Sequence, residues 1–425
     1  MAAETDSSVA AGEVAPGSPS GDRGADPSGE GIWAEVVGQP EAVRTLTSAV
    51  RAARARLRGE STTGGAMTHA WLFTGPPGSG RAEAARAFAG ALQCADAEAP
   101  GCGTCAACET ALAGTHADVT TVAPEGLSIS VAEMRSLVQA AARRPTTGYW
   151  RIVLIEDADR LTEGAANALL KAIEEPPERT VFLLCAPSDH PADVPVTIRS
   201  RCRALQLRTP LVGAIAESLR RRDGIERSTA EWAASVCGGH IGRARRLATD
   251  PQARERRETV LGIPRGLRDL SEVFGEAGRL VRSAETEASE LNEERNEAEK
   301  EELRTAMGAG GTGKGTSSAT KGANAALKEL ERKQKARATR SQRDALDLAL
   351  VDLAGFYRDV LATRFGAMVP LNHPDFARDV SRAAAEWTSE TALRRLEAVL
   401  RCRTALNRNV KPVVAVEALA AELYR

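Results

Sequence analysis

Apolar positions in the first half of the chain follow two different spacings. Three short continuous runs, AWLFTG, YWRIVLIEDAD and TVFLLCAPS, have the length and content of buried β-strands. Around them, apolar residues recur at helical spacing from Val43 onward, over Ala82 to Gln93, and in GAANALLKAIEEP, which ends at Pro176 and Pro177. Strands that alternate with helices predict a parallel, doubly wound α/β sheet.

The strand pattern stops after Leu207, and the remainder is predicted to be helical. A small helical region of residues 209–262 contains the basic segment CGGHIGRARRLATD. A larger one, residues 263–425, includes the amphipathic segments ALRRLEAVLRCRTALNRNV and PVVAVEALAAELY. Residues 1–30 are rich in Gly, Ser, Pro and Ala with hardly any large apolar residue. Such a segment is predicted to be disordered, because it cannot bury enough surface to offset its chain entropy.

A charged insert interrupts the last helical region at about residues 285–343. Glu285 to Arg304 holds nine acidic residues against three basic ones, and Lys321 to Arg343 holds eight basic against two acidic. Opposite charges on two helical arms joined by a glycine-rich turn favour an antiparallel hairpin that projects into solvent. A disordered charged linker explains the same composition equally well.

Composition and charge are those of an ordinary globular protein. The chain has 27% charged and 43% hydrophobic residues and a formal net charge of −1. Contact with nucleic acid would therefore have to come from local patches rather than from a globally basic surface. We find no apolar stretch of membrane-spanning length and no secretory signal pattern, so a cytoplasmic location is expected.

The segment GPPGSGRA after the first predicted strand has the outline of a phosphate-binding loop. Such loops read G-x-x-x-x-G-K-[ST], with the lysine on the β/γ-phosphates and the hydroxyl on Mg²⁺. Here Gly75, Gly78 and Gly80 supply the turn, but Arg81 and Ala82 stand at the two chemical positions. Arginine is bulkier than lysine, and alanine brings no metal ligand. The loop is predicted to bind phosphate weakly at most and not to support hydrolysis.

The second predicted strand ends in Glu156 and Asp157. A P-loop enzyme needs a carboxylate here to hold Mg²⁺ and a second acid to polarise the attacking water. The usual order is Asp-Glu, and adjacent strand residues point to opposite faces, so the reversed order changes the geometry. Two plain acids at a strand end are an equally good interpretation. Combined with Arg81 and Ala82, the reversal indicates a degenerate site.

Four of the eight cysteines are crowded into one segment. Three of them form a C-x₂-C-x₂-C run, and the fourth lies eight residues upstream. This spacing suits a tetrahedral, structural Zn²⁺ held by four thiolates. An iron–sulfur cluster and unliganded thiols remain as alternatives. The four are Cys94, Cys102, Cys105 and Cys108.

The segments ANALLKAIEEPP and VPVTIRSRC carry a family resemblance. With VVGQPEA, the cysteine module and GRARRL, they occur in the order found in bacterial DNA polymerase III clamp loader subunits. The chain resembles this AAA+ family over about residues 31–425, apart from the charged insert. The resemblance implies a P-loop domain at 31–208 with a zinc module at 94–108, a helical lid at 209–262 and a helical collar at 263–425.

Within the family, the degenerate loop is similar to the δ′ type, which does not hydrolyse ATP itself. The resemblance implies that Arg201, in SRC, acts as an arginine finger in a neighbouring subunit's site, and that Arg243 stands at the lid's sensor position. Implied partners are the τ/γ and δ subunits, the sliding clamp and primer-template DNA, within a DNA-directed DNA polymerase holoenzyme. The alternatives are a τ/γ-type ATPase with an atypical loop and a zinc-dependent DNA-binding module.

Overall fold

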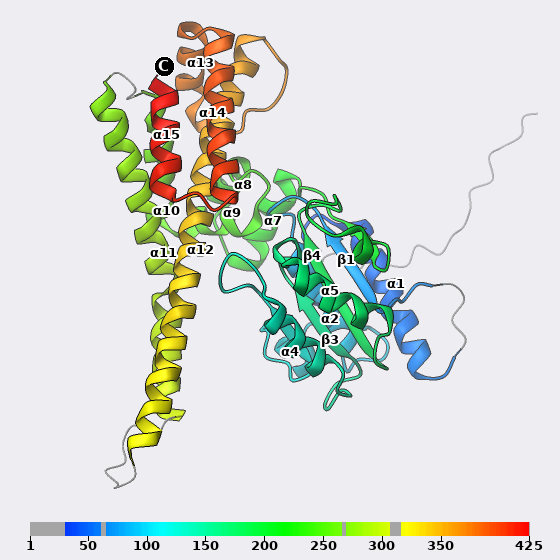
Figure 1. The fold of residues 1–425 in the computed structure, drawn as a ribbon. Helices are drawn as coiled ribbons and strands as arrows, with labels where there is room; N and C mark the ends of the chain where they lie inside the picture. The colour runs from blue at the N-terminus through cyan, green and yellow to red at the C-terminus, as the bar shows by residue number, and fades with distance from the viewer. Residues whose placement is uncertain (1–29, 61–64, 266–268, 307–315, 425) are drawn as a thin grey trace, which may run out of the picture.

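The computed structural model describes residues 30–60, 65–265, 269–306 and 316–424 (Figure 1). The predicted N-terminal tail, residues 1–30, lies outside the described residues except for Glu30. Among the described residues, no helix is both long and apolar enough to cross a membrane.

A five-stranded parallel sheet forms the centre of the N-terminal half, with strand order β2-β3-β4-β1-β5. The doubly wound α/β prediction is confirmed, and the three predicted strands are β1, β3 and β4. The two edge strands were not predicted, since they are short and only partly buried. The strands are β1 (Ala70–Thr74), β2 (Val119–Val122), β3 (Arg151–Ile155), β4 (Thr180–Ala186) and β5 (Arg203–Gln206).

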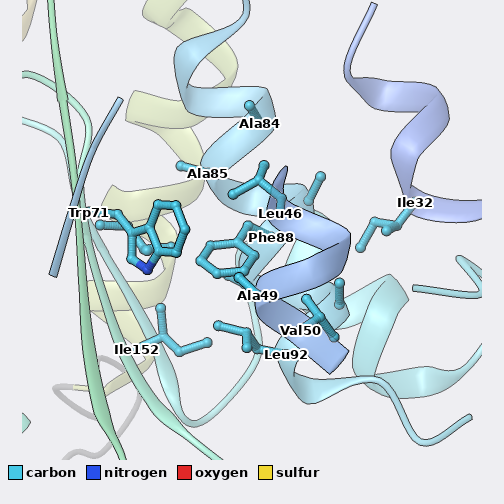
Figure 2. Packing of buried hydrophobic residues seen from close by; sticks show 14 of the residues in the cluster. Ile32, Leu46, Ala49, Val50, Trp71, Ala84, Ala85, Phe88, Leu92 and Ile152 are labelled. Carbon is cyan, nitrogen blue, oxygen red and sulfur yellow. The ribbon is translucent and has the colours of Figure 1, made fainter. Parts of the chain in front are cut away.

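Alternate residues of the central strands enter two separate cores, one on each face of the sheet. On one face, Trp71 of β1 meets Phe88 edge to face at 5.2 Å between ring centroids, and Leu46 and Ile152 close the same cluster (Figure 2). On the other face, Leu72 and Val153 pack against different helices. The first face carries α1 (Pro40–Leu57), α2 (Arg81–Gln93) and α3 (Ala106–Leu112), and the second carries α4 (Val131–Ala141) and α5 (Glu163–Glu174).

Beyond the sheet the described chain is helical. A small core joins Ile215, Leu219 and Leu247 in the first helices, and a larger one joins residues from Val260 to Leu423. Short 3₁₀ segments are η1 (Gly31–Glu35), η2 (Ala158–Arg160), η3 (Ile263–Arg265) and η4 (Pro374–Phe376). The helices are α6 (Val196–Arg199), α7 (Val212–Asp223), α8 (Arg227–Val236), α9 (Ile241–Thr249), α10 (Pro251–Gly262), α11 (Leu270–Ala306), α12 (Thr316–Arg364), α13 (Ala377–Glu386), α14 (Ser389–Asn407) and α15 (Pro412–Tyr424).

The charged insert forms the hairpin that was one of its two interpretations. Helices α11 and α12 run side by side, and Asn292 Nδ2 donates to Ser341 Oγ at 2.9 Å. Arg337 donates to both carboxylate oxygens of Glu299, at 2.9 and 2.6 Å. The glycine-rich turn at 307–315 lies outside the described residues. Unlike the expectation, the hairpin does not only project into solvent, because its inner part contacts the sheet domain.

Candidate functional site

The glycine-rich loop connects β1 to α2 in the position that phosphate-binding loops take. Gly78 has φ +83° and Gly80, the residue before α2, has φ +87°. Side chains rarely adopt these left-handed values, so the glycines are required by the backbone. Ser79 is 2% exposed, and its Oγ has no hydrogen-bond partner. The loop therefore keeps the architecture of a phosphate site.

Arg81 is turned back onto its own loop. Its Nη1 donates to the carbonyl oxygen of Gly75, the first residue of the loop. The neighbouring residue, Ala82, begins the helix with a methyl group and offers no oxygen to a metal ion. The loop thus retains its backbone shape, while its one cation is engaged by a loop carbonyl. Arg81 and Ala82 thus supply neither the lysine nor the hydroxyl of the phosphate-loop pattern.

Each of the two acids that follow β3 is paired with an arginine. Glu156 accepts a hydrogen bond from Arg86 of α2, and Asp157 accepts one from Arg340 of α12. These arginines come from different elements, as expected for consecutive residues that point in different directions. Both carboxylates are therefore neutralised within the chain. Arg340 had no local signal in the sequence, since it lies more than 180 residues away.

Two residues from outside the glycine-rich loop contact it, and the sequence predicted neither contact. Gln39 Nε2 donates to the Ser79 carbonyl at 3.3 Å and to the Arg208 carbonyl at 2.5 Å, which ties the loop to the end of the sheet domain. His240, the residue before α9, lies against Gly78, and its Cα would be 2.4 Å from a Cβ placed there. Burial lowers the pKa of His240, so the neutral form is favoured at this contact.

Arg243 does not join the loop residues in this structure. It is paired with Asp352 of α12, and both side chains are largely buried, at 10% and 4% exposed. The structure therefore places Arg243 between α9 and the C-terminal helices.

A separate cavity of about 450 Å³ lies between η1 and α7, and Gln39, which contacts the glycine-rich loop, is among its lining residues. Its lining includes Val36, Gly38, Pro40 and Ala214.

A substitution at Gly78 measures how tightly α9 is held to the loop. We expect Gly78→Ala to lower the free energy of unfolding by about 3 kcal/mol or more, because φ strain adds to a backbone clash with His240. The matched control is Gly59→Ala, which has φ +76° but nothing within 4 Å of the new Cβ. The control is expected to cost about 1 kcal/mol in urea unfolding. Equal losses of unfolding free energy in the two variants would contradict the close contact between Gly78 and His240.

Arg201 lies on the surface, away from the chain's own loop. It follows α6 and precedes β5, whose first residue, Arg203, pairs with Trp71 near the start of β1. The loop follows the other end of β1, so Arg201 lies near the amino ends of these parallel strands and the loop at their carboxyl ends. Its Nη2 is 2.7 Å from Glu174 Oε1, and both side chains are about 40% exposed. Arg201 also donates to the Thr197 carbonyl at 2.9 Å, so its contacts lie on the surface and none of them reaches its own loop.

The four clustered cysteines converge as a set of metal ligands. All four Sγ atoms lie within 4.8 Å of one another. Cys94 Sγ is 3.6 Å from Cys102 Sγ and 3.9 Å from Cys105 Sγ, while Cys108 completes the group. Four thiolates at about 2.3 Å from a tetrahedral ion would be about 3.8 Å apart, so the geometry fits. All four cysteines are free, and they can hold a metal ion.

The cysteine segment supports the start of the ordered chain. Ile32 N donates to the Gly101 carbonyl at 2.9 Å, and η1 lies so close that a Cβ on Gly101 would be 3.0 Å from Trp33 Nε1. Arg54 Nη2 donates to the Cys94 carbonyl at 2.5 Å. A backbone N–H from Thr104 lowers the pKa of Cys102 to about 6, which favours its thiolate, whereas burial raises the pKa of Cys108. A metal here would fix a loop and η1.

A parallel α/β sheet with a phosphate-type loop, followed by helical regions, defines the class: an AAA+-type P-loop fold with an all-α C-terminal part. Residues 52–210 match the family described as "DNA polymerase III, delta subunit". The chain is also similar to relatives named DNA polymerase III subunit δ′, which is in keeping with this match.

The relatives cover part of the chain. The δ′ subunit of Pseudomonas aeruginosa is 37% identical over 206 residues, 47% of this chain and 62% of the relative. The δ′ subunit of Bacillus subtilis is 33% identical over 157 residues, 37% and 47% of the two chains. The tau subunit of Bacillus subtilis is 34% identical over 171 residues, 40% and 28%. The chain therefore spans less than two thirds of each of these relatives.

Two solved structures similar to this chain are distant likenesses. A DNA polymerase III gamma subunit-related protein of Thermotoga maritima is 19% identical with a TM-score of 0.31, covering 78% of this chain and 94% of that one. The clamp loader delta protein of Bacillus subtilis is 12% identical with a TM-score of 0.29, covering 90% and 98%.

Proposed function

We propose that this chain is a δ′-type subunit of a DNA polymerase III clamp loader that does not hydrolyse ATP in its own site. The observation that carries the proposal is the loop in which Arg81 and Ala82 stand for the lysine and the hydroxyl, with Arg81 bound to the Gly75 carbonyl. The pairing of Glu156 with Arg86 and of Asp157 with Arg340 supports it further. Nucleotide binding in this site is weak or absent.

In this proposal Arg201 completes the nucleotide site of a neighbouring τ/γ subunit. The exposed pair with Glu174 supports this role, because a solvent-exposed ion pair is weak, about 0–1 kcal/mol, and gives way easily to a stronger anion. A guanidinium near a γ-phosphate stabilises the charge that develops during transfer. Arg243 is assigned only to packing between α9 and the C-terminal helices, since Asp352 already engages it.

The metal in the cysteine cluster is proposed to be a structural Zn²⁺. Cys94, Cys102, Cys105 and Cys108 would supply all four ligands and leave no open position for a substrate. Two of the four are buried, and η1 packs against the same loop. Zinc here would stabilise the fold and take no part in chemistry.

The proposed organisation follows the family. Residues 31–208 form the P-loop domain, 209–262 the lid, and 263–425 the collar with the hairpin insert at about 285–343, while the tail of residues 1–29 lies outside the described residues. The subunit would join τ/γ and δ subunits in the cytoplasm and meet the sliding clamp and primer-template DNA through the complex. Its task would be to help load the clamp for the DNA-directed DNA polymerase.

The test is reconstitution of a loader from partner subunits with and without this chain. We expect the purified chain to turn over no ATP, while the complete loader needs it for clamp- and DNA-stimulated turnover. ATP hydrolysis by the chain alone would favour a τ/γ-type ATPase instead. DNA binding by the chain alone with a steep salt dependence would favour a zinc-dependent DNA-binding module.

Restoring the lysine and the hydroxyl of the loop tests whether its backbone can still bind a nucleotide. The double substitution Arg81→Lys with Ala82→Thr returns the missing charge and hydroxyl to an intact backbone cradle. We expect it to raise binding of Mg²⁺–ATP at least about tenfold, measured by calorimetry, without producing turnover. Turnover is not expected because Asp157 remains paired with Arg340. Unchanged binding would show that the loop itself has lost its shape.

A further inference from the structure

The α11–α12 hairpin touches the sheet domain at the loop that follows β2. Glu125 in this loop receives two arginines, since its Oε1 lies 2.8 Å from Arg295 Nη2 of α11 and its Oε2 lies 3.2 Å from Arg337 Nε of α12. Arg337 is only 8% exposed, and Glu299 holds its other side. The carboxylate of Glu125 therefore completes a network that both arms of the hairpin build.

A second group of contacts lies one helical turn further along α12. Arg340 donates to the Pro124 carbonyl and to Asp157, which follows β3. Its Nε is also 3.6 Å from Asp344 Oδ2, and Asp344 Oδ1 is 3.8 Å from Arg160 Nη2 of η2. Arg340 and Asp157 are each 21% exposed, so water screens this pair less than it screens a surface pair.

Next to the first charged group, the loop after β2 and helix α12 come close. A Cβ placed on Gly126 would lie 3.5 Å from Cβ of Ala336, an ordinary van der Waals distance. Small residues on both sides allow this approach, and Arg337 and Arg340 follow it on the same helix. The contact thus combines close packing with neighbouring charge pairs.

Helix α12 also reaches the other parts of the molecule. Further along the same helix, Asp352 holds Arg243 of α9, and Leu353, Phe356 and Val360 enter the core of the C-terminal helices. One continuous helix therefore contacts the sheet domain, α9 and the C-terminal core (Figure 1). A rotation of any of these bodies against the others has to break contacts along α12.

We propose that the α11–α12 hairpin is an intramolecular latch that holds the P-loop domain to the C-terminal helices without any ligand. The latch consists of Glu125, Gly126 and Asp157 on the sheet domain and Arg295, Ala336, Arg337 and Arg340 on the hairpin. Because it takes Asp157 for an ion pair, it also makes that carboxylate unavailable to a metal ion. The latch lies within one chain, so its test does not depend on assembly into a loader.

The first experiment is a cysteine pair in the full chain. Gly126→Cys with Ala336→Cys places two Cβ atoms at a distance suited to a disulfide. The matched control pairs Gly126→Cys with Lys335→Cys, whose side chain is exposed on the neighbouring position of α12. Under oxidised glutathione, with the bond assigned by peptide mass spectrometry, we expect the first pair to form at least about tenfold faster than the control. Equal rates would overturn the latch.

The second experiment tests the charge pair. We expect Arg340→Ala to raise amide hydrogen exchange about tenfold or more in residues 122–126 and 157–160, since it removes charge-assisted hydrogen bonds. The control Arg332→Ala removes an exposed arginine that pairs with Glu329 of the same helix, and it should leave these segments unchanged. Asp157→Asn, which removes only the charge of the partner, should raise exchange in residues 157–160 as well. Exchange that is equal in the Arg340→Ala and Arg332→Ala variants would overturn the proposal.

Discussion

Replacing Arg201 by alanine in this chain alone is expected to lower ATP turnover at the neighbouring subunit's site by about 10³-fold or more. Arginine fingers in other NTPases contribute about 10³–10⁵ in rate, since they stabilise charge only in the transition state. The loss should appear in steady-state, clamp- and DNA-stimulated turnover of a reconstituted loader. Nucleotide affinity at that site should change far less, because the effect belongs to the transition state.

The neighbouring Arg199 supplies the control for this experiment. It lies two residues away on the same surface, is 47% exposed and pairs with Asp189 at 3.0 Å. Arg199→Ala should leave turnover within about twofold of the wild type, and both variants should assemble equally by gel filtration. Arg201→Lys should not restore activity, because an ammonium lacks the planar fork of a guanidinium. Unchanged turnover in Arg201→Ala would leave the chain as a scaffold without a finger.

The parts of the fold that could be predicted are those with strong local patterns. Strands β1, β3 and β4 are almost fully buried, and their continuous apolar runs identify them without tertiary information. Strands β2 and β5 have four residues each and expose part of their side chains, so their segments VTTV and RALQ show no such run. The neighbours along the sheet decide their conformation.

The same distinction separates the site residues. The glycines of the loop and the four cysteines are close in sequence, so spacing alone indicated their chemistry. Gln39, His240 and Arg340 reach the loop region from distant elements, and nothing in their local sequence indicates these contacts. For a related reason, the sequence could not decide whether the charged insert forms a hairpin or a disordered linker. Its blocks of charge fit both, and only hydrogen bonds between the two helices, such as Asn292 to Ser341, distinguish the hairpin from the linker.

Removal of the metal from the cysteine cluster is expected to release η1 while the sheet stays folded. Structural zinc sites in small peptides bind with about 10–16 kcal/mol, and this energy is folding energy. Here it would hold the loop of Gly101 and Gly103 against Ile32 and Trp33, which are 1% and 3% exposed. Chelation, or Cys105→Ser, should raise hydrogen exchange in residues 31–36 and 95–108 by at least about 10²-fold. Strands β3 and β4 lie outside this loop and should keep their protection.

A cysteine outside the cluster supplies the control, and elemental analysis identifies the metal. Cys202→Ser changes a cysteine outside the cluster and should leave metal content and exchange in η1 unchanged. One zinc per chain by elemental analysis, with no visible absorption, would support Zn²⁺, whereas iron with visible charge-transfer bands would assign an iron–sulfur cluster. A chain purified without metal, whose η1 is equally protected with and without chelator, would contradict the site. In that case apolar packing of Ile32 and Trp33 alone would hold η1 in place.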